Sequence, residues 1–195
     1  GIIPVGTTGE SPTVTHEEHT EIIRVAVETA AGRCQVIAGT GSNSTAEAID
    51  LSVEAEKLGA TALLLVAPYY NKPSQEGLYR HFKAIADAVK IPVVLYSIPG
   101  RCGVEIAVET VARLAQDCSN ITCIKEAGGS VERVSALRQA LPDSFEIVSG
   151  DDSLTLPFLA AGAVGVISVA SNYLPKDVCD LVHSWRDGRF DEAAA

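Results

Sequence analysis

The chain has 195 residues, a length that as a prior means one domain or at most two. Its 15 Lys and Arg residues against 25 Asp and Glu residues give a formal net charge of −10. An acidic surface repels nucleic acid and anionic membranes, so neither is expected as a partner. Hydrophobic residues make up 47% and charged residues 21%, which excludes a disordered chain. No apolar run approaches the ~18 residues of a transmembrane span.

Five cysteines are present and none forms a C-x-x-C pair, which indicates neither a zinc knuckle nor a disulfide framework. We expect reduced thiols in a compartment of the cytosolic type, and no signal-peptide pattern opens the chain. The chain contains no methionine and begins inside an apolar run, Gly1 to Val5. We therefore expect these residues to be a segment of a longer protein.

Seven short apolar runs follow one another at roughly the spacing of strand–helix units, about 25–30 residues. The runs are rich in Val, Ile and Leu without polar alternation, which is typical of strands buried on both faces of a parallel sheet. The predicted strands are residues 2–5, 35–38, 62–67, 92–96, 121–124, 145–148 and 164–169.

Amphipathic helical patterns follow these runs, with apolar residues three or four positions apart. Ser44 and Glu47 have the spacing of a capping box, which predicts the start of a helix. Asp151 and Asp152 are interpreted as the N-terminal cap of a helix rather than as a metal site. The clearest helical patterns cover residues 108–115, 131–141 and 178–185.

Seven strand–helix units predict an α/β fold, a (β/α)8 TIM barrel with its first unit outside the chain. The competing architecture is a doubly wound open sheet. The barrel is favoured because potentially reactive residues follow five or six different strands, whereas an open sheet would collect its site at one switch point. We expect residues 1–195 to form one incomplete barrel domain.

Lys125 ends the run 121–124, so its side chain begins inside an apolar barrel. Burial disfavours the ammonium form, which lowers the pKa of the amine and frees it as a nucleophile toward a carbonyl. The alternative is a lysine that pairs with Glu126 or with an aspartate. No cysteine has an adjacent histidine, and His16 and His19 lie on a predicted helix far from the other strands.

Further side chains at strand ends fit a Schiff-base reaction. Tyr96 ends the neighbouring strand, and its phenol can carry protons to a carbinolamine oxygen if another hydroxyl, such as that of Thr7 or Thr8, relays them. Arg101 follows in a Pro-Gly loop, and its planar guanidinium fits a carboxylate. The alternatives are an aromatic cap on the barrel core for Tyr96 and a surface salt bridge for Arg101.

Two glycine pairs, Gly6-x-x-Gly9 and Gly39-x-Gly41, are either backbone cradles for an anion or tight turns. Neither is a G-x-G-x-x-G motif or a P-loop, so nucleotide binding is not indicated. No histidine and carboxylate cluster has the spacing of metal ligands, and no metal site is expected.

Together these stretches resemble the dihydrodipicolinate synthases, a branch of the pyruvate-dependent class I aldolase family that also includes N-acetylneuraminate lyase. The resemblance covers the whole chain and rests on GTTGES at 6–11, APYYNKPSQEGLYRHF at 67–82, LYSIPGRCG at 95–103, IKEAGG at 124–129 and SGDDSLTLPFLAAGAVGVISVASN at 149–172. Family members extend further at both ends, which implies a first strand–helix unit and a C-terminal helical region outside residues 1–195.

The resemblance implies a lyase of lysine biosynthesis that condenses pyruvate with aspartate 4-semialdehyde to give 4-hydroxy-tetrahydrodipicolinate. Lys125 would form the Schiff base with pyruvate. Tyr96 would be the proton shuttle and Thr8 its relay. Tyr70 would reach across a tight-dimer interface to complete the relay in the neighbouring subunit. No cofactor is implied.

The resemblance also implies the substrate contacts. Thr7 and Thr8 would contact the pyruvate carboxylate, and Arg101 would hold the carboxylate of aspartate semialdehyde. Gly150 and Ile167 would line the pocket through backbone atoms.

Within the family, the Thr7-Thr8 doublet and Arg101 favour the synthase branch. Ser97 stands where the family usually has Asn, which weakens the case for this exact substrate. Two alternatives stay open. One is a sister pyruvate-dependent aldolase acting on a sugar acid of the N-acetylneuraminate or 2-keto-3-deoxygluconate type. The other is a non-catalytic barrel paralogue.

The resemblance finally implies a homo-oligomer, a dimer of dimers, in the cytoplasm or in a plant plastid, with allosteric inhibition by lysine at the tight-dimer interface. A carboxylate for the lysine ammonium and polar groups for its carboxylate fit such a ligand. A capping box with Ser44 and a solvated helix face are the alternatives for the glutamate and the histidines of this set. The matching residues are Ser11, His16, His19, Asn43, Glu47 and Tyr69.

Overall fold

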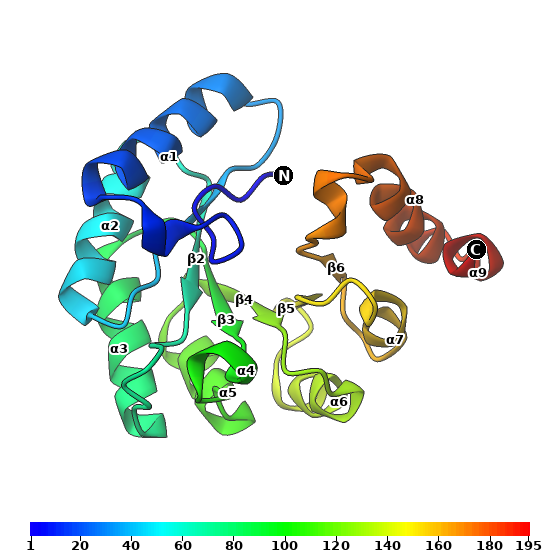
Figure 1. Ribbon diagram of the computed structural model, residues 1–195. Helices are drawn as coiled ribbons and strands as arrows, with labels where there is room; N and C mark the ends of the chain where they lie inside the picture. Colours follow the sequence, from blue (N-terminus) through cyan, green and yellow to red (C-terminus); the bar gives the residue numbers. More distant parts are fainter.

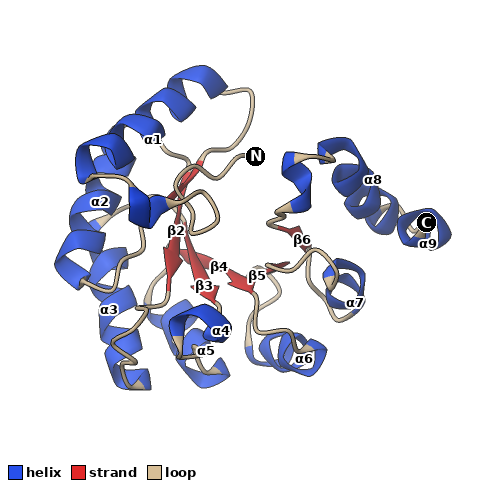
Figure 2. Ribbon diagram, viewed as in Figure 1, coloured by secondary structure: helices blue, strands red, loops and turns tan.

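The computed structural model describes all residues, 1–195, as an α/β fold built on a six-stranded parallel sheet. Each strand pairs in parallel with the next one in the sequence, and the sheet curls (Figure 2). The strands are β1 (Ile37–Gly39), β2 (Ala62–Val66), β3 (Val93–Ser97), β4 (Ile121–Glu126), β5 (Glu146–Ser149) and β6 (Gly165–Val166).

Helices follow one another in chain order around the outside of the curled sheet (Figure 1). The patterns at 108–115, 131–141 and 178–185 correspond to three of them, so these predictions are confirmed. None of the helices combines the length and the apolar character that crossing a membrane requires. The helices are α1 (His16–Ala30), α2 (Thr45–Lys57), α3 (Gln75–Ala88), α4 (Pro99–Cys102), α5 (Val108–Asp117), α6 (Val131–Ala140), α7 (Thr155–Ala160), α8 (Pro175–Arg186) and α9 (Phe190–Ala194), with 3-10 turns η1 (Ser11–Thr13) and η2 (Ala170–Asn172).

The first predicted strand is confirmed only in part. Ile2 makes a parallel bridge with Val36, and Pro4 accepts a backbone hydrogen bond from Gly39 at 3.1 Å, but no full strand forms, because Val5 takes a positive φ of 47° that ends the extended backbone. The last predicted strand, 164–169, is reduced to the two residues of β6. The N-terminal segment and β6 therefore lie at the two ends of the curled sheet (Figure 1).

The strand order runs from β1 to β6 without a reversal. A doubly wound sheet has a switch point where the order reverses and carries helices on both faces. Here the helices lie on the outer face alone (Figure 1). The doubly wound alternative is therefore excluded.

Because side chains alternate along each strand, one face of the sheet packs against the helices and the other lines the concave side. Leu63, Leu65, Leu95 and Ile124 are fully buried in the core, which also contains the largest apolar side chains of α3, α5 and α6. Their neighbours in the strands line the opposite, concave face. The packed layer between sheet and helices thus holds the strand ends in place, and the concave face is left for a pocket.

The predicted helix cap at Asp151 and Asp152 is also wrong. The residue at the N-cap of α7 is Leu154, and no side chain caps this helix. The Asp152 carboxylate instead accepts hydrogen bonds at 3.0 Å from the backbone N–H groups of Val169 and Ala170, where η2 begins. Asp152 is 17 and 18 positions from these partners, and no local sequence pattern predicts a contact between residues so far apart in the chain.

Gly39 and Gly41 permit close packing of backbones. A Cβ on Gly39 would lie 2.3 Å from the carbonyl oxygen of Val5, and one on Gly41 would lie 2.4 Å from the backbone nitrogen of Val66. Neither glycine has a positive φ, so neither forms the tight turn that the sequence left open. Glycine is required at both positions because a side chain would collide with neighbouring backbone.

We predict that Gly39→Ala lowers the free energy of unfolding by at least about 2 kcal/mol, because the added methyl group meets backbone that no rotamer change can move. The measurement is urea denaturation of the intact protein. Gly100→Ala is the control, since a Cβ there has nothing within 4 Å, and should stay within about 0.5 kcal/mol of the parent. Equal losses for both variants would contradict the packing argument.

Candidate active site

A pocket of about 340 Å³ opens at the carboxyl ends of the strands, on the concave side of the sheet. One wall is the turn at residues 6–9, and another is residues 167–173 beyond β6. Between them lie Leu64, Tyr96 and Lys125 from three neighbouring strands. The wider depression between α8 and α9 has only polar and charged lining and contains no residue of the predicted site.

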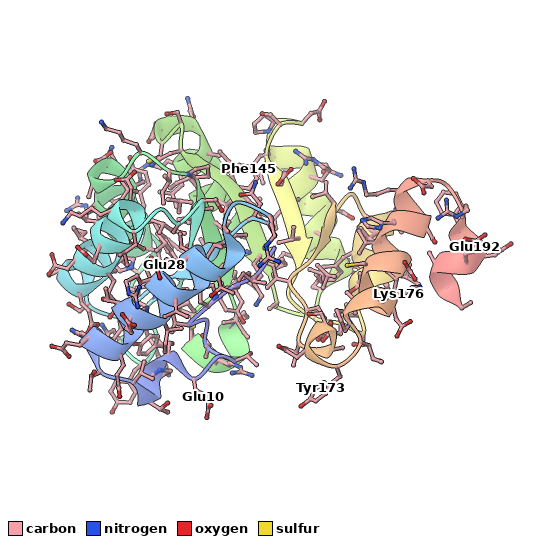
Figure 3. All side chains as sticks on the ribbon, turned by 90° about the horizontal axis from the view of Figure 1, so that it is seen from above. Glu10, Glu28, Phe145, Tyr173, Lys176 and Glu192 are labelled. Carbon is pink, nitrogen blue, oxygen red and sulfur yellow. The ribbon has the colours of Figure 1, made fainter.

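The pocket lies at one edge of the molecule. Figure 3 shows Glu10, next to the first wall, and Tyr173, in the second, on the same edge. Phe145, which precedes β5, lies toward the opposite edge. This is the geometry expected of a parallel sheet, whose strand ends gather side chains from distant parts of the sequence at one edge.

Lys125 occupies the floor of this pocket. Its side chain is 8% exposed, and its Nζ lies 4.1 Å from the centre of the Tyr96 ring. The pKa of the amine is lowered to about 8, chiefly by burial and also by the nearby charge of Arg101, while Asp152 acts in the opposite direction. A substantial fraction of the amine is therefore neutral near physiological pH.

The predicted alternative for Lys125, an ion pair, is not found. The Glu126 carboxylate accepts instead from Nε of Arg133, at 2.8 Å. No aspartate forms a salt bridge with Lys125. No salt bridge therefore stabilises the charged form of this amine.

Tyr96 is paired in register with Lys125 across β3 and β4, so both side chains point to the concave face. Its side chain is buried, and burial raises the pKa of the phenol while the charge of Arg101 lowers it. The phenol is thus protonated at neutral pH. It can donate a proton to an oxygen atom bound next to the amine.

The structure brings most of the predicted substrate contacts together. Thr7, Thr8 and Ile167 line the same pocket as Lys125. Gly150 packs behind the lysine, since a Cβ on it would lie 3.0 Å from Cε of Lys125. A larger residue at this position would push the lysine side chain out of place.

Two predicted residues lie outside the pocket wall. Arg101 is exposed on α4, near enough for its charge to lower the pKa of both Lys125 and Tyr96. Tyr70 is 91% exposed and has a φ of 70°, a left-handed conformation that is costly for a bulky side chain. Within one chain Tyr70 contributes nothing to the pocket.

Ser97 does not reach the pocket either. It is fully buried at the end of β3, and its Oγ accepts a long hydrogen bond, 3.4 Å, from the backbone N–H of Ile106. Ser97 therefore contacts the loop behind the site and takes no part in the pocket wall.

Several residues that shape the site have no role predicted from the sequence. Ser168, Asn172 and Tyr173 line the second wall, and Asp152 holds that wall through its bonds to η2. The polar stretch directly after the run 164–169 was the available signal. Its residue types point to no particular chemistry, so the sequence alone could not rank them.

The residues of the predicted lysine site lie around the start of α2. Nε2 of His16 is 2.5 Å from Oε1 of Glu47, and the other Glu47 oxygen accepts from the hydroxyl of Ser42. The Ser42 bond is the main cause that lowers the pKa of Glu47, with His16 adding to it. The carboxylate is therefore charged and half-exposed, as a site for an ammonium group requires.

The capping box predicted at Ser44 is half-formed. The Ser44 hydroxyl accepts from the N–H of Glu47 at 3.4 Å, but the Glu47 carboxylate turns to Ser42 and His16. The neighbouring Asn43 donates to the carbonyl of Tyr69 at 3.3 Å.

His19 corrects two of the predictions. It is buried, and its Nε2 lies 2.8 Å from the carbonyl oxygen of Gly39 in β1, so it is neither far from the strands nor on a solvated face. Burial lowers the pKa of its ring, which is neutral at physiological pH. Ser11 begins the short η1 turn and stays outside these bonds.

Fold and site together define an α/β protein whose pocket is centred on a buried lysine with a lowered pKa. The model of the Dihydrodipicolinate synthetase family matches residues 1–195. The chain belongs to this family.

Two curated relatives are named 4-hydroxy-tetrahydrodipicolinate synthase. The protein from Pelobacter propionicus is 56% identical over 99% of this chain and 66% of its own length. The protein from Aquifex aeolicus is 52% identical over 98% of this chain and 65% of its own length. The chain thus spans just under two thirds of the length of the relatives it matches.

Solved structures of the same family are also similar to this chain. The 4-hydroxy-tetrahydrodipicolinate synthase of Methylacidiphilum fumariolicum SolV superimposes with a TM-score of 0.99 at 61% identity, over 100% of this chain and 65% of that one. DHDPS from Cyanidioschyzon merolae with lysine bound gives a TM-score of 0.95 at 47% identity, over 98% of this chain and 65% of that one. None of these relatives bears the name of a sugar-acid aldolase, so that alternative is not favoured.

We predict that Lys125 is the lysine whose side chain reacts at the lowest pH. Its labelling by trace acetic anhydride should rise with a midpoint near pH 8, because only the neutral amine is nucleophilic. Lys176, whose pKa is raised by its hydrogen bond to Asp180, is the internal control and should respond only at higher pH. Peptide mass spectrometry measures both. The same midpoint for the two lysines would contradict the burial argument.

Proposed function

We propose that this chain carries the active site of a lyase that condenses pyruvate with aspartate 4-semialdehyde, through a Schiff base on Lys125, to give 4-hydroxy-tetrahydrodipicolinate. The observation that carries the proposal is the buried amine, with a pKa near 8, against the ring of a protonated tyrosine. The names of relatives at 50–56% identity support the choice of substrates.

The first half of the reaction uses the groups at the pocket floor. The neutral amine of Lys125 attacks the keto carbon of pyruvate and forms a carbinolamine. Its oxygen leaves as water after proton transfer from the Tyr96 phenol, which Thr8 reprotonates by relay. Loss of the amine proton and of water leaves an iminium ion, and loss of a methyl proton converts it to an enamine.

The second half joins the two substrates. The enamine carbon attacks the aldehyde carbon of aspartate semialdehyde, whose oxygen takes up a proton. The amino group of that substrate then attacks the imine carbon and displaces the Lys125 amine, which closes the ring and regenerates the enzyme. Hydroxyl and backbone groups of Thr7 and Thr8 hold the pyruvate carboxylate, and the Arg101 guanidinium holds the carboxylate of the semialdehyde at the mouth.

The proton relay requires a second copy of the chain. Tyr70 is exposed and held by the backbone in a left-handed conformation, which supports a role against a neighbouring subunit. A homo-oligomer, arranged as a dimer of dimers, would supply this neighbour. Five unpaired cysteines support a reducing compartment, the cytoplasm or a plastid.

The complete architecture would be a (β/α)8 barrel. The unbroken strand order, the outer helices and the superposition at a TM-score of 0.99 support it. The gap between the N-terminal segment and β6 would be closed by the remaining strand–helix units.

We predict that pyruvate with borohydride adds a reduced pyruvyl group to Lys125 of the intact protein, because reduction traps the Schiff base at the only buried amine. Mass spectrometry of peptides locates the adduct. Lys125→Ala should lower kcat/KM by several orders of magnitude, since covalent catalysis is lost. Lys83→Ala removes a lysine paired with Asp87 on α3 and should leave activity unchanged. An adduct on Lys83 or on no lysine refutes the mechanism.

We further propose that free lysine inhibits the enzyme at the cluster around Glu47. The half-exposed carboxylate of Glu47 would bind the lysine side-chain ammonium, and Asn43 and Tyr69 would bond its α-carboxylate. The DHDPS structure with lysine bound supports an amino-acid ligand for this family. Because Tyr69 is next to Tyr70, the coupling path to the proton relay is short.

We predict that added lysine lowers kcat more than it changes the pyruvate KM, with a coupling free energy of ~1–3 kcal/mol. Glu47→Ala should abolish the response and leave uninhibited activity largely intact. Glu54→Ala is the matched control on the same helix, since Glu54 pairs only with the exposed Lys57, and should keep the response. Absence of inhibition at millimolar lysine would refute the regulation and leave the catalytic proposal untouched.

A further inference from the structure

A buried ion cluster lies directly behind the reactive lysine. Glu126 follows Lys125 in β4 and points to the opposite face of the sheet, where it is fully buried. Its Oε2 accepts from Nε of Arg133 at 2.8 Å, and its Oε1 accepts from the N–H of Gly128 at 2.6 Å. No step of the proposed reaction uses these groups.

The guanidinium of Arg133 joins three separate segments. Arg133 belongs to the first turn of α6, and its side chain is 9% exposed. Besides Glu126 it binds Oε2 of Glu105, with Nη1 at 3.3 Å, and its Nη2 donates to the carbonyl of Ile106. One planar fork therefore ties the end of β4 to residues 105 and 106.

Residues 105 and 106 close the loop that carries Arg101. Gln75 of α3 holds the same end of this loop, with Nε2 2.8 Å from the Glu105 carbonyl and Oε1 accepting from the N–H of Ala107 at 2.9 Å. The backbone N–H of Ile106 donates to Ser97 at the end of β3. The loop is thus anchored at its far end while Arg101 itself stays exposed.

The near end of the loop meets the same cluster. A Cβ on Gly128 would lie 2.6 Å from Oε1 of Glu126, 3.4 Å from Oε1 of Glu105 and 3.6 Å from Cγ of Pro99. Pro99 opens α4, the helix of Arg101. Both ends of the Arg101 loop therefore rest on the turn that directly follows Lys125.

Stability alone does not account for such a cluster. Removing two charges from water costs about as much as their attraction returns, and apolar residues of similar volume stabilise a core at least as well. A planar guanidinium can donate to several acceptors at fixed angles, which an ammonium group cannot do. It therefore holds those acceptors in a defined arrangement.

We propose that Arg133, through its bonds to Glu126, Glu105 and Ile106, is a positioning residue that fixes the Arg101 guanidinium relative to the Lys125 amine and so sets the affinity for the second, carboxylate-bearing substrate. The inference rests on the proposed function, in which Arg101 binds that carboxylate. Arg133 itself touches neither substrate.

The test is Arg133→Lys in the intact protein, which keeps the charge and removes the fork. The KM for aspartate semialdehyde should rise about tenfold or more, the range expected when a bidentate contact loses its alignment. The rate of borohydride-trapped Schiff-base formation with pyruvate should stay within about twofold. Arg138→Lys is the matched control, since Arg138 lies on the same helix and bonds only the carbonyls of Leu141, Pro142 and Phe145. It should change neither quantity.

A double-mutant cycle separates positioning from packing. In an Arg101→Ala background, Arg133→Lys should add no further loss, because its effect passes through Arg101. If Arg133→Lys does not fold, Glu105→Gln removes one half-exposed arm of the cluster and should raise the same KM by a smaller factor.

The outcomes are distinguishable. Equal losses in both half-reactions, losses that add to those of Arg101→Ala, or an unchanged KM in Arg133→Lys and in Glu105→Gln each overturn the positioning role. Absence of a pyruvate adduct on Lys125 in the unaltered protein overturns the proposed function instead.

Discussion

Burial of one amine at the end of β4 is the constraint on which the site depends. The pKa of Lys125 falls from an ordinary value of 10.5 to about 8 because water is excluded from its ammonium form. The difference corresponds to a cost of folding on the order of 3 kcal/mol at neutral pH, since the unfolded chain binds the proton more tightly. This cost is complete below pH 8 and disappears as the pH rises through the two pKa values. The tight layer between sheet and helices must offset it.

The same strand end sends its next residue, Glu126, to the other face of the sheet. Lys125 thus remains without an anionic partner, although a carboxylate is adjacent in the sequence. A parallel strand allows this separation because its side chains alternate, so the backbone keeps the two charges on opposite sides. The lack of a salt-bridge partner for Lys125 and the contact of Glu126 with Arg133 are consequences of one alternation.

Elements with a strong local pattern were predictable from the sequence. Six of the seven apolar runs are strands, the amphipathic stretches are helices, and Lys125, Tyr96, Thr7 and Thr8 meet in one pocket because parallel strands end at one edge. The failures involve contacts between distant residues. Asp152 bonds to η2 and not to its own helix, and His19 bonds to β1. Arg133 is seven positions from its partner Glu126, so periodicity places it on a helix but says nothing of the loop it holds.

The positive charge of Arg101 acts on two groups of the pocket and lowers the pKa of both. Its positive charge lowers the pKa of Lys125 and also that of Tyr96, against the rise that burial causes in the phenol. The charge of Arg101 therefore adds to burial in favouring the neutral amine of Lys125. A bound carboxylate would neutralise that charge and let both pKa values rise. The distance from the guanidinium to the amine matters for both effects, because the interaction of charges falls with separation. An anchored loop keeps that distance constant.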